Sequence, residues 1–239
     1  MGDDRAETHI AIIPARAGSK EIKNKNLKEI MGRSLVHHAL YSAVSQGFFS
    51  QVILTTDIKK LMVSTDGWVI RQRPEHLAHD DTPMSQVIHD VLAHTDVGAE
   101  TYVWLLQPTS PFRISEDYKN IRALLKSEEE SRSWISMYQV EDSHPTRQYT
   151  ISSGGVAHPI VGKANPFTNR QQLKPCFQRN GLYYVIKAGV FRDRHTLQAE
   201  PITPYIMDPR RSHNINTEWD LEVAFVTAKL LRDKGLWPS

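Results

Sequence analysis

Short apolar runs that alternate with helix-like stretches dominate the first two-thirds of the chain. The runs lie at residues 9–15, 51–56, 68–71, 101–106 and 134–140, and residues 35–44 and 85–94 carry apolar side chains at helical spacing. Such alternation is typical of right-handed crossovers and a mainly parallel sheet, and runs without polar alternation fit strands covered on both faces. The sequence therefore predicts an α/β fold with a mostly parallel, Rossmann-like central sheet flanked by helices.

The alternation breaks near His144. Several prolines and the pair Gly154–Gly155 lie between there and about residue 178, which predicts a hairpin and an extended excursion rather than another crossover. A strand is expected again at residues 181–186. Ser115 is a candidate helix cap, and Thr217 with Asp220 predicts a capping box at the start of a last helix. The 239 residues suit a single domain over 1–239 with an excursion at about 144–178.

Composition and charge exclude several classes of protein. Lys and Arg total 29 against 27 Asp and Glu, a net charge of +2, which excludes a uniformly basic nucleic-acid binder and an acidic disordered tail. One cysteine, Cys176, forms no intramolecular disulfide and disfavours a cysteine-built zinc site. No apolar run approaches the roughly 18 residues of a membrane span, and the start does not resemble a secretory signal. We expect a cytoplasmic protein without nucleic-acid or membrane partners.

Basic residues cluster directly after the first apolar run. Arg16, Lys20, Lys23, Lys25 and Lys28 follow the strand, with Gly18, Ser19 and Asn26 among them. Ligands of open α/β sheets bind beyond the carboxyl ends of strands. Backbone N–H groups near a glycine can cradle an anion, and lysine and arginine supply the charge that a polyphosphate needs. The segment is neither a P-loop nor a dinucleotide fingerprint, and on charge alone a basic surface loop remains an equal alternative.

The complete pattern of motifs is more specific than the charge. In order along the chain it resembles the acylneuraminate cytidylyltransferases, which make CMP-activated sialic acids and related sugars. The resemblance covers about residues 9 to 231. The matching segments are residues 14–20 (PARAGSK), Lys25–Asn26, Thr55–Asp57, Arg73–Glu75, Leu77–Ala78, Asp81–Thr82, Ser85, residues 105–111 (LLQPTSP), Asn169–Gln171, Asn180–Gly181 and Asn214–Glu218.

This resemblance implies transfer of CMP from CTP to an anionic 2-keto-3-deoxy sugar acid of the sialic, legionaminic or pseudaminic type, with release of pyrophosphate. It implies a homodimer built by the excursion, and Mg²⁺ as cofactor. The implied catalytic residues are Arg16, Lys20 and Lys25. The implied nucleotide-binding residues are Ala15, Gly18, Ser19, Asn26, Arg73 and Ser85. The implied acceptor-binding residues are Gln107, Thr109, Ser110, Arg170, Gln178, Arg179 and Asn180. On composition alone, residues 107–111 also fit a rigid turn.

Two departures from the family pattern concern the metal and the acceptor. The family has Asp-x-Asp before the last helix, where this chain has Asn214 and Asn216, so two expected magnesium carboxylates are amides. Either the triphosphate and water hold the metal, or Asp57, Asp208 or Asp220 substitutes, or catalysis is reduced or lost. Gln178 stands where an arginine is usual, and Arg179 comes one residue late. Alternatives are therefore another anionic acceptor, such as a small acid or phosphonate, or a non-catalytic nucleotide-binding paralogue.

Overall fold

The computed structural model describes residues 7–63, 67–128, 130–162 and 173–237. Within them the main sheet has seven strands in the order β11-β7-β10-β6-β1-β4-β5. Neighbours pair in parallel except around β10, which runs antiparallel to both β6 and β7. The predicted mostly parallel sheet is thus confirmed. The strands are β1 (His9–Ala15), β4 (Gln51–Thr56), β5 (Val69–Gln72), β6 (Tyr102–Leu105), β7 (Ser133–Val140), β10 (Cys176–Lys187) and β11 (Ile202–Ile206).

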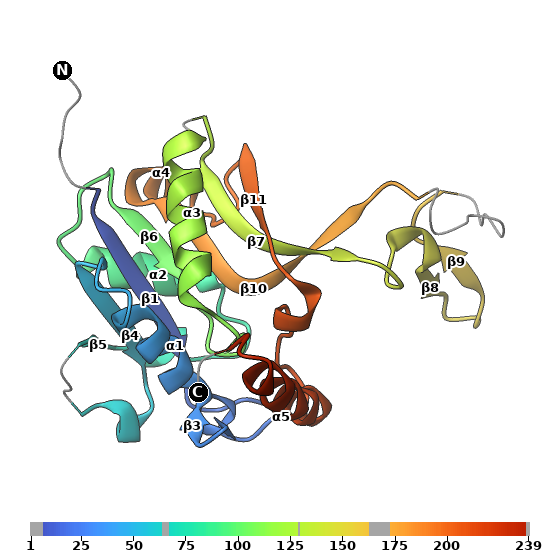
Figure 1. Ribbon diagram of the computed structural model, residues 1–239, viewed down its shortest axis with the longest axis horizontal. Coiled ribbons are helices and arrows are strands. Elements are labelled where there is room, and N and C mark those ends of the chain that lie inside the picture. Colours follow the sequence, from blue (N-terminus) through green and yellow to red (C-terminus); the bar gives the residue numbers. More distant parts are fainter. Residues whose placement is uncertain (1–6, 64–66, 129, 163–172, 238–239) are drawn as a thin grey trace.

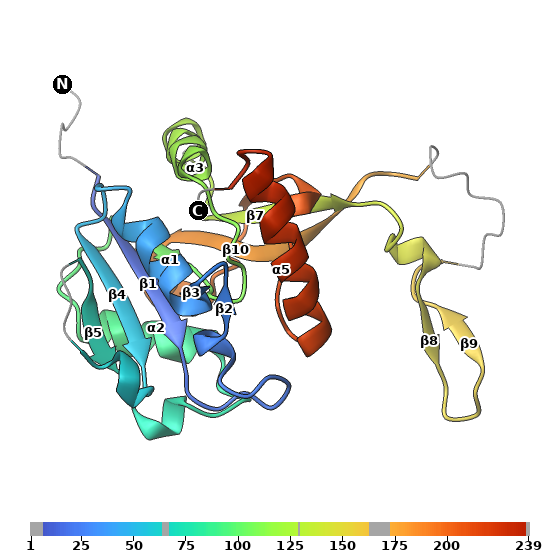
Figure 2. The same ribbon diagram turned by 60° about the horizontal axis from the view of Figure 1, so that its bottom comes forward.

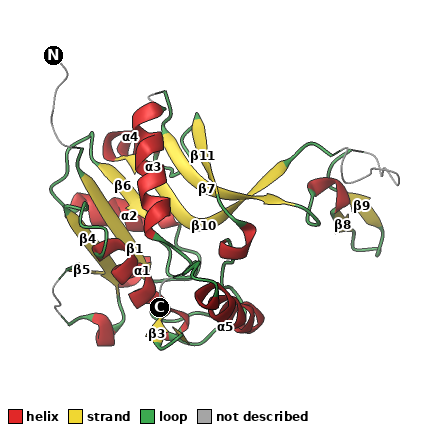
Figure 3. Ribbon diagram, viewed as in Figure 1, coloured by secondary structure: helices red, strands yellow, loops and turns green. Residues whose placement is uncertain are grey.

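Helices cover both faces of this sheet (Figures 1 and 3). Alternate residues of β1 point to opposite faces, so Ala11 and Ile13 pack with α1 (Leu35–Val44) and α3 (Ser115–Ser127). Ile10 and Ile12 pack instead with α2 (Met84–Ala93) and α4 (Ala188–Arg194). The long helix α5 (Glu218–Asp233) belongs to a third apolar cluster with residues of the loops. The core therefore lies on both sides of the central strands.

An arm projects from the body of the molecule (Figure 2). Strands β7 and β10 extend outward as an antiparallel pair, from Val140 opposite Cys176 to Met137 opposite Arg179. At its tip β8 (Tyr149–Ile151) pairs antiparallel with β9 (Ala157–Pro159). The arm corresponds to the predicted excursion, of which residues 163–172 lie outside the described residues. Shorter elements are the strands β2 (Glu29–Ile30) and β3 (Arg33–Ser34) and the 3-10 helices Lys25–Leu27, Lys59–Leu61, Glu75–Leu77, Pro145–Arg147 and Pro209–Arg211.

Several local predictions differ from the structure. Ser115 is the first residue of α3 rather than its cap, because the Asp117 carboxylate accepts the Ile114 N–H and closes the turn one residue earlier. Strand β10 begins at Cys176 instead of residue 181, since pairing with β7 continues into the arm. Helix α4 and strand β11 were not predicted from the sequence. The prediction of a capping box from Thr217 and Asp220 is confirmed.

His9 on β1 makes the fold sensitive to acid. Its side chain is 1% exposed, and its Nδ1 accepts a hydrogen bond from the Trp104 indole N–H at 3.2 Å, which requires a neutral ring. Burial, aided by Arg122 and Lys126, lowers the pKa of His9 to about 4. An unfolded histidine titrates near 6.5, so protonation favours the unfolded chain. Stability is fully present above about pH 6.5 and is lost as the pH falls toward 4, by about 3 kcal/mol.

We therefore expect the free energy of unfolding to fall more steeply between pH 7 and 4.5 in the wild-type protein than in His9→Gln. Urea titrations at the two pH values measure this difference. The exposed His89 provides the matched control, and His89→Gln should retain the wild-type slope. An equal loss in the wild-type protein and His9→Gln would show that other groups cause the acid sensitivity.

Candidate active site

The basic loop after β1 is held by contacts at both of its sides. The Ala17 N–H donates to Asp57 Oδ1 at 2.5 Å, and Asn26 Nδ2 donates to the Arg16 carbonyl at 3.0 Å. Gly18 adopts a φ of +58°, a left-handed conformation that favours glycine. Asp57 follows β4, so the neighbouring parallel strand fixes where the loop begins. Backbone and basic side chains are thereby gathered at the carboxyl end of β1.

A cavity of about 180 Å³ opens at this end of the sheet. It lies where the parallel strands β1, β5 and β6 end, the usual ligand position in open α/β sheets. Its volume is below the roughly 300–1,000 Å³ of whole-ligand pockets, so it suits part of a ligand, such as its phosphates. Eight of the predicted site residues line it, namely Arg16, Gly18, Ser19, Lys25, Asn26, Arg73, Gln107 and Thr109.

Asp80 pairs with two of the loop cations. Arg16 Nη2 donates to Asp80 Oδ1, and Lys20 Nζ lies 3.4 Å from Oδ2. Desolvation alone would raise the pKa of Asp80, but the two cations outweigh it and the pKa is lowered. Lys20 does not line the cavity, and its side chain is 80% exposed. A polyphosphate entering the site would compete with Asp80 for both cations.

The cations that line the cavity differ in burial. Arg73 is 4% exposed, donates from Nη2 to the Thr55 carbonyl at 3.0 Å, and leaves Nε without a partner. Burial lowers the pKa of Arg73 to about 10, although Asp57 acts in the opposite direction. Burial and the charge of Arg16 lower the pKa of Lys25 as well. Carboxylates act on both groups only from a distance, and within the described residues neither group forms an ion pair with one. An anionic ligand would therefore supply a direct counter-charge.

The loop after β6 meets the bulge of β10 at the other side of the cavity. Gln107 and Thr109 line the cavity, whereas Ser110 is fully buried and its hydroxyl donates to the Asn180 carbonyl at 3.0 Å. The Asn180 side chain donates to Ser212 at 2.9 Å and accepts from Ser136 at 2.5 Å. Ser110 and Asn180 therefore hold the loops together from beneath, while Gln107 and Thr109 face the cavity.

Four further predicted site residues, Ala15, Ser85, Gln178 and Arg179, do not line this cavity. Ser85 of α2 lines a separate cavity of about 710 Å³, together with several histidines. Gln178 and Arg179 are exposed where β10 enters the arm, and Gln178 accepts a hydrogen bond from the Tyr138 hydroxyl at 3.0 Å. Arg170 lies outside the described residues. Ala15 ends β1 as a buried residue.

The residues at the expected metal position do not fit a magnesium ion held by the protein. The side chain of Asn216 is exposed, and Oδ1 of Asn214 is a buried oxygen without a hydrogen-bond partner. Asp57 accepts the Ala17 N–H, Asp208 pairs with Arg210, and Asp220 caps α5 through the N–H groups of Asn216 and Thr217. The described ranges contain no cluster of three His, Cys, Asp or Glu residues suited to a metal. The carboxylates that could substitute therefore already have partners.

A doubly covered parallel sheet with a basic, glycine-containing loop at the end of its first strand has the build of a nucleotide-binding protein. The sequence model of the cytidylyltransferase family matches residues 10–215, which is most of the chain. This chain belongs to the cytidylyltransferase family, whose relatives here are CTP-dependent nucleotidyltransferases. The class of enzyme predicted from the sequence is thus confirmed at the level of the family.

Individual relatives refine this assignment. The chain is 27% identical to the CMP-N,N'-diacetyllegionaminic acid synthase of Legionella pneumophila over 93% of this chain and 95% of that protein. It is 28% identical to an N-acylneuraminate cytidylyltransferase of Streptococcus agalactiae, over 88% of this chain but only 51% of that protein, so it spans about half of that relative. A solved CMP:2-keto-3-deoxy-manno-octonic acid synthetase complexed with CTP has a similar fold, with a TM-score of 0.67, 14% identity, and coverage of 95% and 100% of the two chains.

Proposed function

We propose that this protein transfers CMP from CTP to an anionic 2-keto-3-deoxy sugar acid and releases pyrophosphate. The observation that carries the proposal is the cavity at the end of β1, lined by Arg16, Lys25 and Arg73 beside the backbone of Gly18 and Ser19. Arg73 is buried and Lys25 is partly buried, and within the described residues neither forms an ion pair with a carboxylate. A triphosphate satisfies such a site, and the cytidylyl specificity follows from the family.

In the proposed reaction a hydroxyl oxygen of the acceptor attacks the α-phosphate of CTP. The bond from the α-phosphorus to the bridging oxygen breaks, pyrophosphate leaves, and the hydroxyl proton passes to solvent. Arg16 and Lys25 would hold the phosphates and stabilise the negative charge that spreads over their oxygens in the transition state. Lys20 would join them after leaving Asp80. Arg73 would bind the nucleotide beside Asn26, and Gln107 would orient the acceptor across the cavity.

The choice of a sugar acid as acceptor is supported by two relatives, whose names refer to N-acylneuraminic acid and to N,N'-diacetyllegionaminic acid. A different anionic acceptor, such as a small acid or a phosphonate, is favoured by the exposed Gln178 and Arg179, which lie outside the cavity. A non-catalytic nucleotide-binding role is favoured by the amides at 214 and 216.

We place the protein in the cytoplasm, where CTP is available. A membrane-spanning helix is absent from the described part of the chain.

The decisive experiment measures pyrophosphate release from CTP over a panel of sialic, legionaminic and pseudaminic acids, small 2-keto acids and phosphonates. Turnover with a nonulosonic acid supports the proposal, and turnover only with another anion supports the alternative acceptor. Calorimetric titration with CTP should show binding in either case. Binding without turnover of any acceptor would leave the non-catalytic role.

Magnesium use is proposed to depend on the phosphates of CTP and on water, because Asn214 and Asn216 bring no charge to the site. The same CTP titration with Mg²⁺ and with a chelator tests this idea directly. A protein-held ion would be detected as Mg²⁺ binding without nucleotide, and that result would contradict the proposal.

We propose a homodimer because of the apolar side chains that the arm exposes. The tip hairpin exposes the apolar side chains Tyr149, Ile151, Val156, Ile160 and Val161, which find no cover within the described part of the chain. A second copy would bury them by the hydrophobic effect. Sedimentation should report a dimer for the wild-type protein, and a double substitution Ile151→Asp and Val156→Asp should shift it to monomer.

A further inference from the structure

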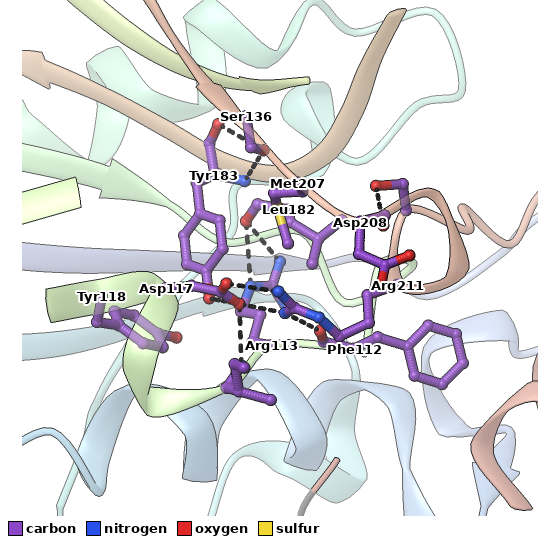
Figure 4. A network of polar contacts seen from close by, with 12 residues as sticks. Phe112, Arg113, Asp117, Tyr118, Ser136, Leu182, Tyr183, Met207, Asp208 and Arg211 are labelled. Carbon is purple, nitrogen blue, oxygen red and sulfur yellow. Dashed lines mark hydrogen bonds and ion pairs between the residues drawn. The ribbon is translucent and has the colours of Figure 1, made fainter. Parts of the chain in front are cut away.

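A buried network of charged and aromatic side chains joins α3 to β10 and to the loop after β11 (Figure 4). Its centre is Asp117 near the start of α3, which is 1% exposed. Arg211 forms a two-pronged ion pair with this carboxylate, at 2.6 Å to Oδ2 and 2.8 Å to Oδ1. The hydroxyl groups of Tyr183 and Tyr205 donate to the same carboxylate at 3.2 and 3.0 Å. One carboxylate thus joins α3, β10, β11 and the loop that follows β11.

Arg113 connects the loop after β6 to strand β10. Its Nη2 donates to the carbonyls of Gln107 and Leu182, both at 2.8 Å, and its Nε donates to Leu182 at 3.1 Å. Its guanidinium carbon also lies 5.6 Å from the centre of the Tyr183 ring. The backbone of Gln107 is therefore tied to the strand that carries Gly181.

The loops held in this way meet at Gly181. A β-carbon placed on Gly181 would lie 2.7 Å from Gln107 Oε1, 2.9 Å from Ser110 Oγ and 3.5 Å from Asn214 Nδ2. The Ile215 N–H donates to the Thr109 carbonyl at 2.8 Å, which joins the loop after β11 to the loop after β6. Positions of Gln107 and Asn214 are consequently fixed by the buried groups behind them.

These buried charges are costly to keep. Two guanidinium groups, Arg113 and Arg211, face one carboxylate, and Nη1 of the 2% exposed Arg113 has no hydrogen-bond partner. Burial lowers the pKa of Arg113, because removing its charge from water is unfavourable. Apolar side chains of similar volume often stabilise a core better than buried ions do. Hydrogen bonds and ion pairs are directional and can fix the geometry of the loops, whereas apolar packing is not directional and would not do so.

We propose that Asp117, Arg113 and Arg211 are positioning residues that set the acceptor side of the active site independently of the nucleotide side. The proposal rests on the proposed function. In the described part of the chain, the recorded hydrogen bonds of the three side chains run to residues 107, 112, 114, 182, 183 and 205 and to one another, and not to the basic loop after β1.

Replacing Asp117 with asparagine removes the charge but keeps the shape of the side chain. We expect kcat/KM for the sugar acid to fall about 10- to 100-fold through misplaced loops, whereas the CTP dissociation constant changes less than about threefold. Hydrogen exchange at the Ile215 N–H should become faster. The milder variants Tyr205→Phe and Arg113→Lys should shift the same readouts in the same direction, and they cover the case in which Asp117→Asn does not fold.

The matched control is Asp90→Asn, which weakens another bidentate ion pair, in which Arg71 Nη2 lies 2.7 Å from Asp90 Oδ1. It should leave the KM for the sugar acid and the exchange of Ile215 unchanged. Parallel changes in CTP affinity and acceptor KM in the network variants, or no change in either, would overturn the proposal. If the wild-type protein turns over no sugar acid, the proposed function fails, and exchange at Ile215 alone decides whether the network positions the loops.

Discussion

Replacing Lys25 with methionine should lower kcat/KM for CMP transfer by about 10²- to 10³-fold, the usual effect of removing one group that stabilises transition-state charge. Lys25 lines the cavity in the short helix Lys25–Leu27, and methionine retains most of its volume. Steady-state pyrophosphate release at saturating acceptor measures the effect. CTP affinity measured by calorimetry should also fall, because the half-buried positive charge at the proposed phosphate site is lost.

The pH dependence of CTP binding gives a second readout for the same residue. Burial and Arg16 lower the pKa of Lys25 below its ordinary value of 10.5. As the pH rises toward this lowered pKa, the free protein loses the positive charge that favours binding, and CTP affinity should weaken. Lys25→Met should show a flatter profile over the same range.

Lys23 is the matched control, because it lies in the same loop, is exposed and does not line the cavity. Lys23→Met removes the same charge from the molecule, so its effect measures the long-range contribution of net charge alone. We expect a change of less than about threefold, as for a screened surface charge. Equal losses for the two variants would mean that Lys25 acts through general charge rather than through contact with the phosphates.

The sequence predicted the parts of the fold that depend on local patterns. Continuous apolar runs identified the central strands such as β1 and β4, and the Thr217–Asp220 capping box was found from residue types alone. Strand β11 was not identified because it carries Pro204, and a proline is tolerated there only since β11 lies at the edge of the sheet. The extent of β10 depended on pairing with β7 in the arm, which no local pattern encodes.

The sequence predicted the part of the candidate site whose residues lie close together along the chain, as in the loop from Arg16 to Asn26. Residues that act through distant contacts were not found. Asp80 is not among the predicted site residues, although its carboxylate meets Arg16 across the site. Asp117 is not among them either, because its role depends on Arg211, which lies beside it only in the fold. Ser85 matches a family motif, yet its side chain lines a different cavity.

Replacing Gly181 with alanine should reduce turnover of the acceptor. Among changes on the acceptor side of the site, we expect this one to have the largest effect. Gly181 has a φ of +78°, where an L-residue is strained by roughly 1–2 kcal/mol. The added methyl group would also lie 2.7 Å from Gln107 Oε1 and 2.9 Å from Ser110 Oγ, and such overpacking costs about 1–3 kcal/mol more. Gln107 must move, so we expect kcat/KM for the sugar acid to fall about 100-fold.

The control for this change is Gly155→Ala in the arm. Gly155 has nearly the same φ, +77°, but no neighbouring atom of the described residues lies within 4 Å of the added β-carbon. It should therefore lose only the roughly 1–2 kcal/mol of backbone strain, as measured by urea unfolding, and keep wild-type acceptor kinetics. CTP affinity should remain unchanged in both variants, because neither glycine touches the loop after β1. Equal kinetic losses in the two variants would show that backbone strain, and not the displacement of Gln107, controls acceptor use.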